Sequence, residues 1–139
     1  MIAVSGDMRD PEGILADAGL TELIDLAEPA CVIMSGVLHF VDAATARGVA
    51  AAFIRALAPG SYLIISVGSG APSEGQAFTS AYTAAQIHIH SEREVVSFFN
   101  GLELVPPGVV PVRGWSGDGL TPNLKPRTAT FLGGVARKP

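Results

Sequence analysis

Two continuous apolar runs mark the centre of the chain. Ala30–Ser35 and Ser61–Val67 are almost wholly apolar, which is typical of strands covered on both faces of a sheet. Between them, apolar residues recur at helical spacing over Ala43–Leu57, and Asp42 is the expected N-cap. A strand, a helix of crossover length and a second strand predict a parallel pair with a right-handed crossover.

The residues before the first run predict a short strand and two short helices. Ile2–Val4 is apolar and is expected to form the strand. Asp10 is the expected N-cap of the first helix, because its side chain can accept from exposed backbone N–H groups, and Gly19 is expected to end that helix. Thr21 is the expected cap of the second helix.

The second half of the chain predicts one further helix and the rest of the sheet. Ser91 and Glu94 have the spacing of a capping box, which indicates a helix start. Further strands are expected at Leu102–Val105, Val109–Val112 and Thr128–Val135.

Composition limits the classes of protein that fit. A length of 139 residues indicates one domain, and 48% hydrophobic with 16% charged residues excludes a disordered chain. The net charge of −4 argues against a nucleic-acid-binding surface. No apolar stretch approaches the roughly 20 residues of a membrane span, and no signal peptide is recognised, so a cytoplasmic protein with no membrane partner is expected.

Cys31 is the only cysteine of the chain. A single cysteine excludes a disulfide framework and a cysteine-based zinc site within one chain. Because Cys31 lies inside the apolar run ACVIM, it is interpreted as a small buried hydrophobic residue.

Three histidines are candidates for chemistry. His39 follows the first buried strand, and ligands of α/β folds bind outside the carboxyl ends of strands. It is therefore either a residue on the cofactor side of the fold or a structural residue at the strand end. His88 and His90 are separated by one residue and are interpreted as a solvated polar stretch, so no metal site is expected.

Two further features suggest loops. Gly68–Gly75 follows a strand, but no Lys-Ser/Thr pair follows its glycines, so a flexible loop is favoured over a phosphate cradle. A helix is expected over Gln76–Gln86. Arg113–Arg127 is rich in glycine and proline, and for Trp115 within it packing of the loop is favoured over a lid on a substrate pocket.

From Ala30 onward, the order of signals resembles the C-terminal half of a class I S-adenosylmethionine-dependent methyltransferase. Val37-Leu38-His39-Phe40 follows the first strand, Leu57-Ala58-Pro59-Gly60 ends the crossover helix, and Gly101–Val105 leads into a later strand. The chain is similar to a bacterial methyltransferase-like family of unknown substrate, which has a glycine-rich closing strand like Gly133-Gly134-Val135.

The resemblance covers nearly the whole chain and implies its fold. Residues 1–139 would form a partial methyltransferase-like domain of the Rossmann-type α/β class. Its sheet would be mostly parallel, with the antiparallel closing strand between Ser61–Val67 and Leu102–Val105.

The resemblance also implies a cofactor, S-adenosylmethionine, and residues that bind it. Asp7 corresponds to the acidic residue that accepts a hydrogen bond from the adenine amino group, and Met8 would lie against the adenine ring. The segment after the first apolar strand would line the methyl-donor side of the cofactor, through Ser35, Gly36, Leu38 and His39.

The family's glycine-rich first strand and ribose-binding acid would lie before Met1. The chain is therefore expected to be a truncated or incomplete methyltransferase with weak or no activity alone. Two rivals are a non-catalytic interaction protein derived from a half-domain, and an enzyme whose upstream coding region was left out. No catalytic residue is assigned, and no set of residues selects the small-molecule methyl acceptor.

A homodimer is also expected. In the complete fold the first strand would lie beside Ala30–Ser35, so the edge of this strand is expected to be open and to pair with a second copy. The alternative cover for that edge is Ile2–Val4, folded back within the same chain.

Overall fold

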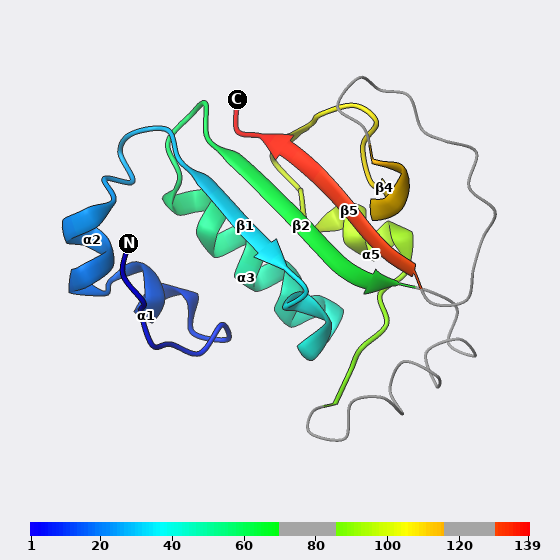
Figure 1. Ribbon diagram of the computed structural model, residues 1–139, viewed down its shortest axis with the longest axis horizontal. Helices are drawn as coiled ribbons and strands as arrows, with labels where there is room; N and C mark the ends of the chain where they lie inside the picture. Colours follow the sequence, from blue (N-terminus) through cyan, green and yellow to red (C-terminus); the bar gives the residue numbers. More distant parts are fainter. Residues whose placement is uncertain (70–85, 116–129) are drawn as a thin grey trace.

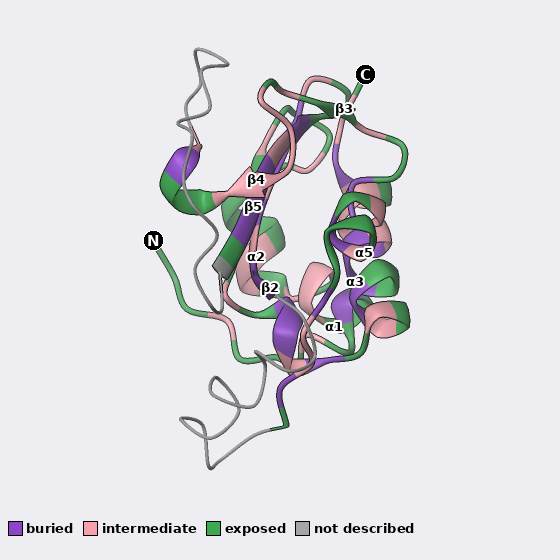
Figure 2. Cartoon of the chain, turned by 90° about the vertical axis from the view of Figure 1, so that its right-hand side faces the viewer, coloured by how far each residue is buried: buried purple, intermediate pink, exposed green. Residues whose placement is uncertain are grey.

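The computed structural model describes residues 1–69, 86–115 and 130–139 (Figure 1). Within these ranges, five strands form one sheet, and helices α3 and α5 lie on the same side of it (Figure 2). The elements in chain order are α1 Pro11–Leu15, α2 Ala18–Leu23, β1 Cys31–Ser35, the 3-10 turn η1 Leu38–Phe40, α3 Ala43–Ala56, β2 Tyr62–Ser69, α5 Glu92–Ser97, β3 Glu103–Leu104, β4 Val110–Pro111, the 3-10 turn η2 Val112–Gly114 and β5 Thr130–Arg137.

The strand order is β1-β2-β5-β3, and β4 also pairs with β5. Strands β1 and β2 are parallel, with Ile33 opposite Ile64, and α3 connects them as predicted. The closing strand β5 is antiparallel to both β2 and β3, which confirms its predicted position. The predicted mostly parallel sheet is correct only in part. Strands β1 to β4 run in one direction, but β5 lies between them, so the β2–β5, β3–β5 and β4–β5 pairs are antiparallel.

The hydrophobic core lies between one face of the sheet and the helices α3 and α5. Alternate residues of β2 point into it and are fully buried, namely Leu63, Ile65 and Val67. Helix α3 contributes Val49 and Ala50 to this core, and the end of α5 contributes Phe98 and Phe99. Helix α3 begins as predicted, because the side chain of Asp42 accepts from the backbone N–H of Thr45 at 2.9 Å.

The prediction that β1 is covered on both faces is wrong. Met34 is buried, but Ile33 is 65% exposed, and Cys31 is also exposed rather than buried. Side chains alternate between the two faces of a strand, and in Figure 1 no helix is drawn in front of β1. We call this side of β1 and β2 the open face, defined by Cys31, Ile33, Ser35, Tyr62, Ile64 and Ser66.

The segment before β1 differs from the prediction in two places. Ile2–Val4 forms no strand, and Ile2 is exposed, so a short apolar run without a neighbouring strand edge does not order as a strand. Asp10 caps α1 as predicted, but the helix ends at Leu15. The side chain of Asp17 accepts from the N–H of Leu20 and starts α2 there, so Gly19 lies inside α2 and Thr21 is not its cap.

The capping box of α5 is confirmed. The N–H of Ser91 donates to the Glu94 carboxylate at 2.8 Å, and the N–H of Glu94 donates to the Ser91 hydroxyl at 3.3 Å. Strands β3 and β4 are shorter than predicted, and β5 extends to Arg137 because it pairs along the whole of β2.

Several predictions fall wholly or partly outside the described residues. Gly68 and Ser69 belong to β2 rather than to a loop, whereas the rest of the predicted loop and all of the predicted helix except Gln86 lie outside. Most of the predicted Arg113–Arg127 loop lies outside as well. None of the helices described is both long and apolar enough to cross a membrane.

Candidate cofactor site at the carboxyl edge of the sheet

Strands β1 and β2 are parallel, so both end at the same edge of the sheet. Gly36 follows β1 with a φ of 66° and turns the chain toward η1, and its N–H donates to the carbonyl of Ser66 at 2.8 Å. The hydroxyls of Ser35 and Ser66 lie 3.1 Å apart. Ligands of open α/β sheets bind beyond this kind of edge, so Ser35, Gly36 and η1 are placed where a cofactor would be expected.

His39 lies in η1 and is 3% exposed. Its Nδ1 accepts a long hydrogen bond of 3.4 Å from the N–H of Gly68, so the proton of the neutral ring is on Nε2. The ring also lies against Phe40, with the ring centres 4.5 Å apart. His39 therefore ties the end of β1 to the end of β2, as a structural residue at a strand end would.

Burial lowers the pKa of His39 from its usual 6.5, and the charge on nearby His90 lowers it further. A histidine with a lowered pKa in the folded protein takes up protons more readily when the chain unfolds. The contribution of His39 to stability is therefore present at neutral pH and falls as the pH drops through about 6.5.

His90 is buried, which corrects the prediction of a solvated polar stretch. Its Nε2 lies 3.0 Å from the carbonyl oxygen of Leu38, and its own carbonyl accepts from the hydroxyl of Ser69 at 2.6 Å. His88 is half-buried, and its backbone N–H donates to the carbonyl of His39 at 2.8 Å. Within residues 1–69, 86–115 and 130–139, no three His, Cys, Asp or Glu side chains are arranged to hold a metal ion.

Asp7 is exposed and ion-paired with Arg9. The Arg9 guanidinium donates to both carboxylate oxygens, at 2.7 Å to Oδ2 and 3.0 Å to Oδ1, and the Arg9 backbone N–H also donates to Oδ1. These hydrogen bonds lower the pKa of Asp7 to about 2, so the carboxylate is charged at neutral pH. The pair lies on the surface, where the side chain of Asp7 is 50% exposed.

Met8 and Leu38 meet in one apolar cavity of about 180 Å³ beside β1. Asp7 does not line this cavity, although it is next to Met8 in the chain. The structure thus brings together Met8 and Leu38, and it places Gly36 and His39 in the adjoining turn. The other residues that line the cavity are apolar, namely Ile14, Val32, Ile33, Met34, Val37, Val49 and Phe53.

A second, polar cavity of about 370 Å³ borders the same two segments. Arg9 comes from the turn that holds Asp7 and Met8, and Phe40 comes from η1. Its remaining lining residues come from the start of α3 and from the segment before α5, namely Val41, Asp42, Thr45, Gln86 and His88.

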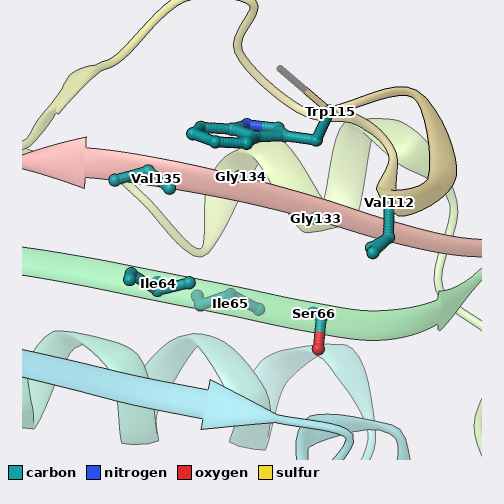
Figure 3. A pocket seen from close by; sticks show the side chains of 8 residues that line it. All are labelled: Ile64, Ile65, Ser66, Val112, Trp115, Gly133, Gly134 and Val135. Carbon is teal, nitrogen blue, oxygen red and sulfur yellow. The ribbon is translucent and has the colours of Figure 1, made fainter. Parts of the chain in front are cut away.

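A third cavity, of about 330 Å³, lies over the middle of β2 and β5 rather than at the carboxyl edge (Figure 3). The indole of Trp115 lies over β5, next to Val112, which agrees with packing of this segment on the sheet. The Nε1 of Trp115 is buried and has no hydrogen-bond partner among the described residues.

Comparison with known proteins identifies close structural relatives. A DUF574 family protein from Streptomyces avermitilis is 34% identical, with a TM-score of 0.84 over 98% of this chain and 54% of that protein. A candidate methyltransferase from Thermobifida fusca is 30% identical, with a TM-score of 0.80 over 97% of this chain and 53% of that protein. The chain therefore spans about half the length of these two relatives.

A more distant structure shows the same fold. The N-methyltransferase NodS from Bradyrhizobium japonicum, solved with S-adenosyl-L-homocysteine, is 17% identical, with a TM-score of 0.54 over 98% of this chain and 53% of that protein. Among curated proteins the chain has no significant match.

The family is established by sequence. A model of the S-adenosyl methyltransferase family matches residues 2–139, which is almost the whole chain. The Rossmann-type α/β fold and the cofactor class, S-adenosylmethionine, are those that the resemblance in sequence implied. The chain belongs to the S-adenosyl methyltransferase family.

Proposed function

We propose that this chain binds the adenosyl end of S-adenosylmethionine at the carboxyl edge of β1. The observation that carries the proposal is the meeting of Met8 and Leu38 in one apolar cavity, with Asp7, whose carboxylate is charged, next to Met8 in the chain. A flat apolar ring with an amino group suits these neighbours, because the ring can pack against Met8 and Leu38 while the amino group donates to Asp7. Membership of the family supports the same cofactor.

The turn after β1 would face the methyl-donor side of the cofactor. Ser35, Gly36 and His39 lie in this turn, and Gly36 gives it a compact shape. When bound, S-adenosylmethionine supplies a methyl group activated by its positive sulfur. We assign no catalytic residue, since none of these side chains is placed against a methyl acceptor.

We propose that activity of this chain alone is weak or absent. Methyl transfer depends on holding the sulfur, the methyl group and the acceptor in line, and loss of that orientation lowers the rate steeply. The described residues place no glycine-rich turn at a helix start beside the carboxyl edge, and the chain spans about half the length of its solved relatives. The polar cavity lined by Arg9, Asp42 and His88 is our candidate for the site that binds the methyl acceptor, a small molecule.

Replacing Asp7 by alanine is expected to weaken binding of S-adenosylhomocysteine by about 1–3 kcal/mol, the usual effect of removing one charged hydrogen-bond partner. The dissociation constant can be measured by chemical-shift titration, which also covers binding weaker than micromolar. Asp25→Ala is the matched control, because Asp25 is an exposed acid whose side chain accepts a local hydrogen bond, from the N–H of Ala27. Equal affinities for the wild type and Asp7→Ala would remove Asp7 from the site.

The second candidate function is a non-catalytic interaction protein that dimerises. It is favoured by β1, which pairs only with β2 among the described strands and carries the exposed Ile33 on the open face. An open strand edge beside apolar side chains is a template for pairing with another chain. A cytoplasmic location fits this proposal, because Cys31 is an exposed thiol and thiols stay reduced in that compartment.

For the homodimer, light scattering is expected to give about twice the chain mass of 14.3 kDa, and Ile33→Lys is expected to give the monomer. A lysine at this position puts a charge into the apolar contact on both copies. Val96→Lys is the control, since Val96 is 40% exposed and belongs to α5, which covers the other face of the sheet from the open face. A wild type that stays monomeric at high concentration would contradict the dimer.

A further inference from the structure

The imidazole of His90 connects the segment before α5 to the turn that carries the candidate cofactor residues. His90 is 1% exposed, and its Nε2 lies 3.0 Å from the carbonyl oxygen of Leu38. We propose that His90 is a positioning residue, whose hydrogen bond to Leu38 fixes η1 and so the shape of the cofactor edge. The importance of that edge rests on the proposed function, whereas the link between His90 and η1 rests on geometry.

The chemistry of the contact fixes the direction of the hydrogen bond. A carbonyl oxygen only accepts, so Nε2 of His90 carries a proton and donates to Leu38. The ring itself is held from a second side, because it packs edge-on against Phe98 with the ring centres 5.3 Å apart. The backbone of His90 is held by the hydroxyl of Ser69 at the end of β2. Among the described residues, the hydrogen-bond partner of this buried donor is the carbonyl of Leu38 in η1.

Two backbone N–H groups from other described segments also donate to η1. The backbone N–H of His88 donates to the carbonyl of His39, and the backbone N–H of Gly68 donates to Nδ1 of His39. His90 therefore supplies a hydrogen bond whose donor a substitution can remove while leaving these backbone donors in place. Loss of it should loosen both remaining bonds, because all three hold the same short turn.

The pKa of His39 gives a second, independent readout of a substitution at His90. A charge on His90 lowers the pKa of His39 in η1, after the larger effect of burial, and it also lowers the pKa of Glu94 on α5. Arg47 on α3 faces Glu94 as well and acts on it in the same direction. A substitution that removes the imidazole of His90 removes one cause of the lowered pKa of His39, so that pKa should rise.

The test compares His90→Phe with His90→Gln. Phenylalanine keeps an aromatic ring against Phe98 but cannot donate, whereas the glutamine amide can donate from nearly the same position. Amide hydrogen exchange by NMR at His88 and Gly68 reports on η1, and exchange at Leu63 reports on the core. In His90→Phe, exchange at His88 and Gly68 is expected to rise about fivefold to tenfold relative to Leu63, the effect of one lost hydrogen bond.

His90→Gln is expected to keep the protection of the wild type, while the pKa of His39 rises in both variants. His88→Gln is the matched control, because the hydrogen bond from His88 to η1 among the described residues is made by its backbone N–H. Unchanged protection in His90→Phe would overturn the proposal, and so would equal loss of protection in His90→Gln. If the wild type fails to bind S-adenosylhomocysteine, the proposed function fails, while the exchange result still decides the role of His90.

Discussion

Phe98→Ala is expected to reduce the free energy of unfolding by about 3–5 kcal/mol, as is usual for removing a buried phenylalanine from a core. Phe98 is 1% exposed and belongs to the same core cluster as Val67 and Leu132. Its ring also packs edge-on against His90, so the substitution removes support from the carboxyl edge as well as from the core. A domain is usually stable by only about 5–15 kcal/mol, so this loss should be visible in a urea melt.

Val96→Ala is the control for Phe98→Ala. Val96 lies in α5, two residues before Phe98, which is the C-cap of this helix, but Val96 is 40% exposed. Substitutions at exposed positions usually change stability by less than about 0.5 kcal/mol. A loss smaller than about 1 kcal/mol in Phe98→Ala would show that the packing of α5 on the sheet is described wrongly.

The second large effect is expected at Gly36, where a valine should cost about 1–3 kcal/mol and displace η1. Gly36 has a φ of 66°, a left-handed conformation that β-branched residues rarely adopt. Space is not the cause, since an added Cβ would meet only the ring of His39 at an ordinary 3.8 Å. The cost therefore comes from the backbone conformation of the turn that leads from β1 to Leu38 and His39.

Gly36→Asn separates the effect of the backbone conformation from the effect of an added side chain, because asparagine tolerates the left-handed region better than other non-glycine residues. Thermal melts of Gly36→Asn should lie close to the wild type and those of Gly36→Val well below it. If both variants melt like the wild type, the turn does not depend on the left-handed conformation.

The central unit of the fold could be predicted because its signals are local and agree with one another. Continuous apolar strands, a helix capped by Asp42 and a capping box at Ser91 each depend on residues close together in the chain. The prediction that β5 lies between β2 and β3 depends on the resemblance to a family, since no local pattern encodes strand order.

The errors have physical reasons that a single sequence does not contain. Cys31 and Ile33 have the pattern of a doubly covered strand, and the part of the chain that the structure describes puts no helix over one face of it. The sequence predicts a solvated His90, because its partner, the carbonyl of Leu38, lies far away in the sequence. Asp17 competes with Thr21 as a helix cap, and the two cannot be ranked without the geometry of the turn between α1 and α2.

The most direct test of the account is to map S-adenosylhomocysteine onto the isotopically labelled 139-residue chain by NMR. The account predicts that the amide signals of Met8, Gly36 and Leu38 shift progressively with ligand, with a dissociation constant weaker than micromolar. Signals at the opposite end of the same two strands, such as that of Tyr62, should stay in place. Shifts confined to the cavity over β2 and β5, such as those of Ile64 and Val135, or no shifts at millimolar ligand, would contradict a cofactor site at the carboxyl edge of β1.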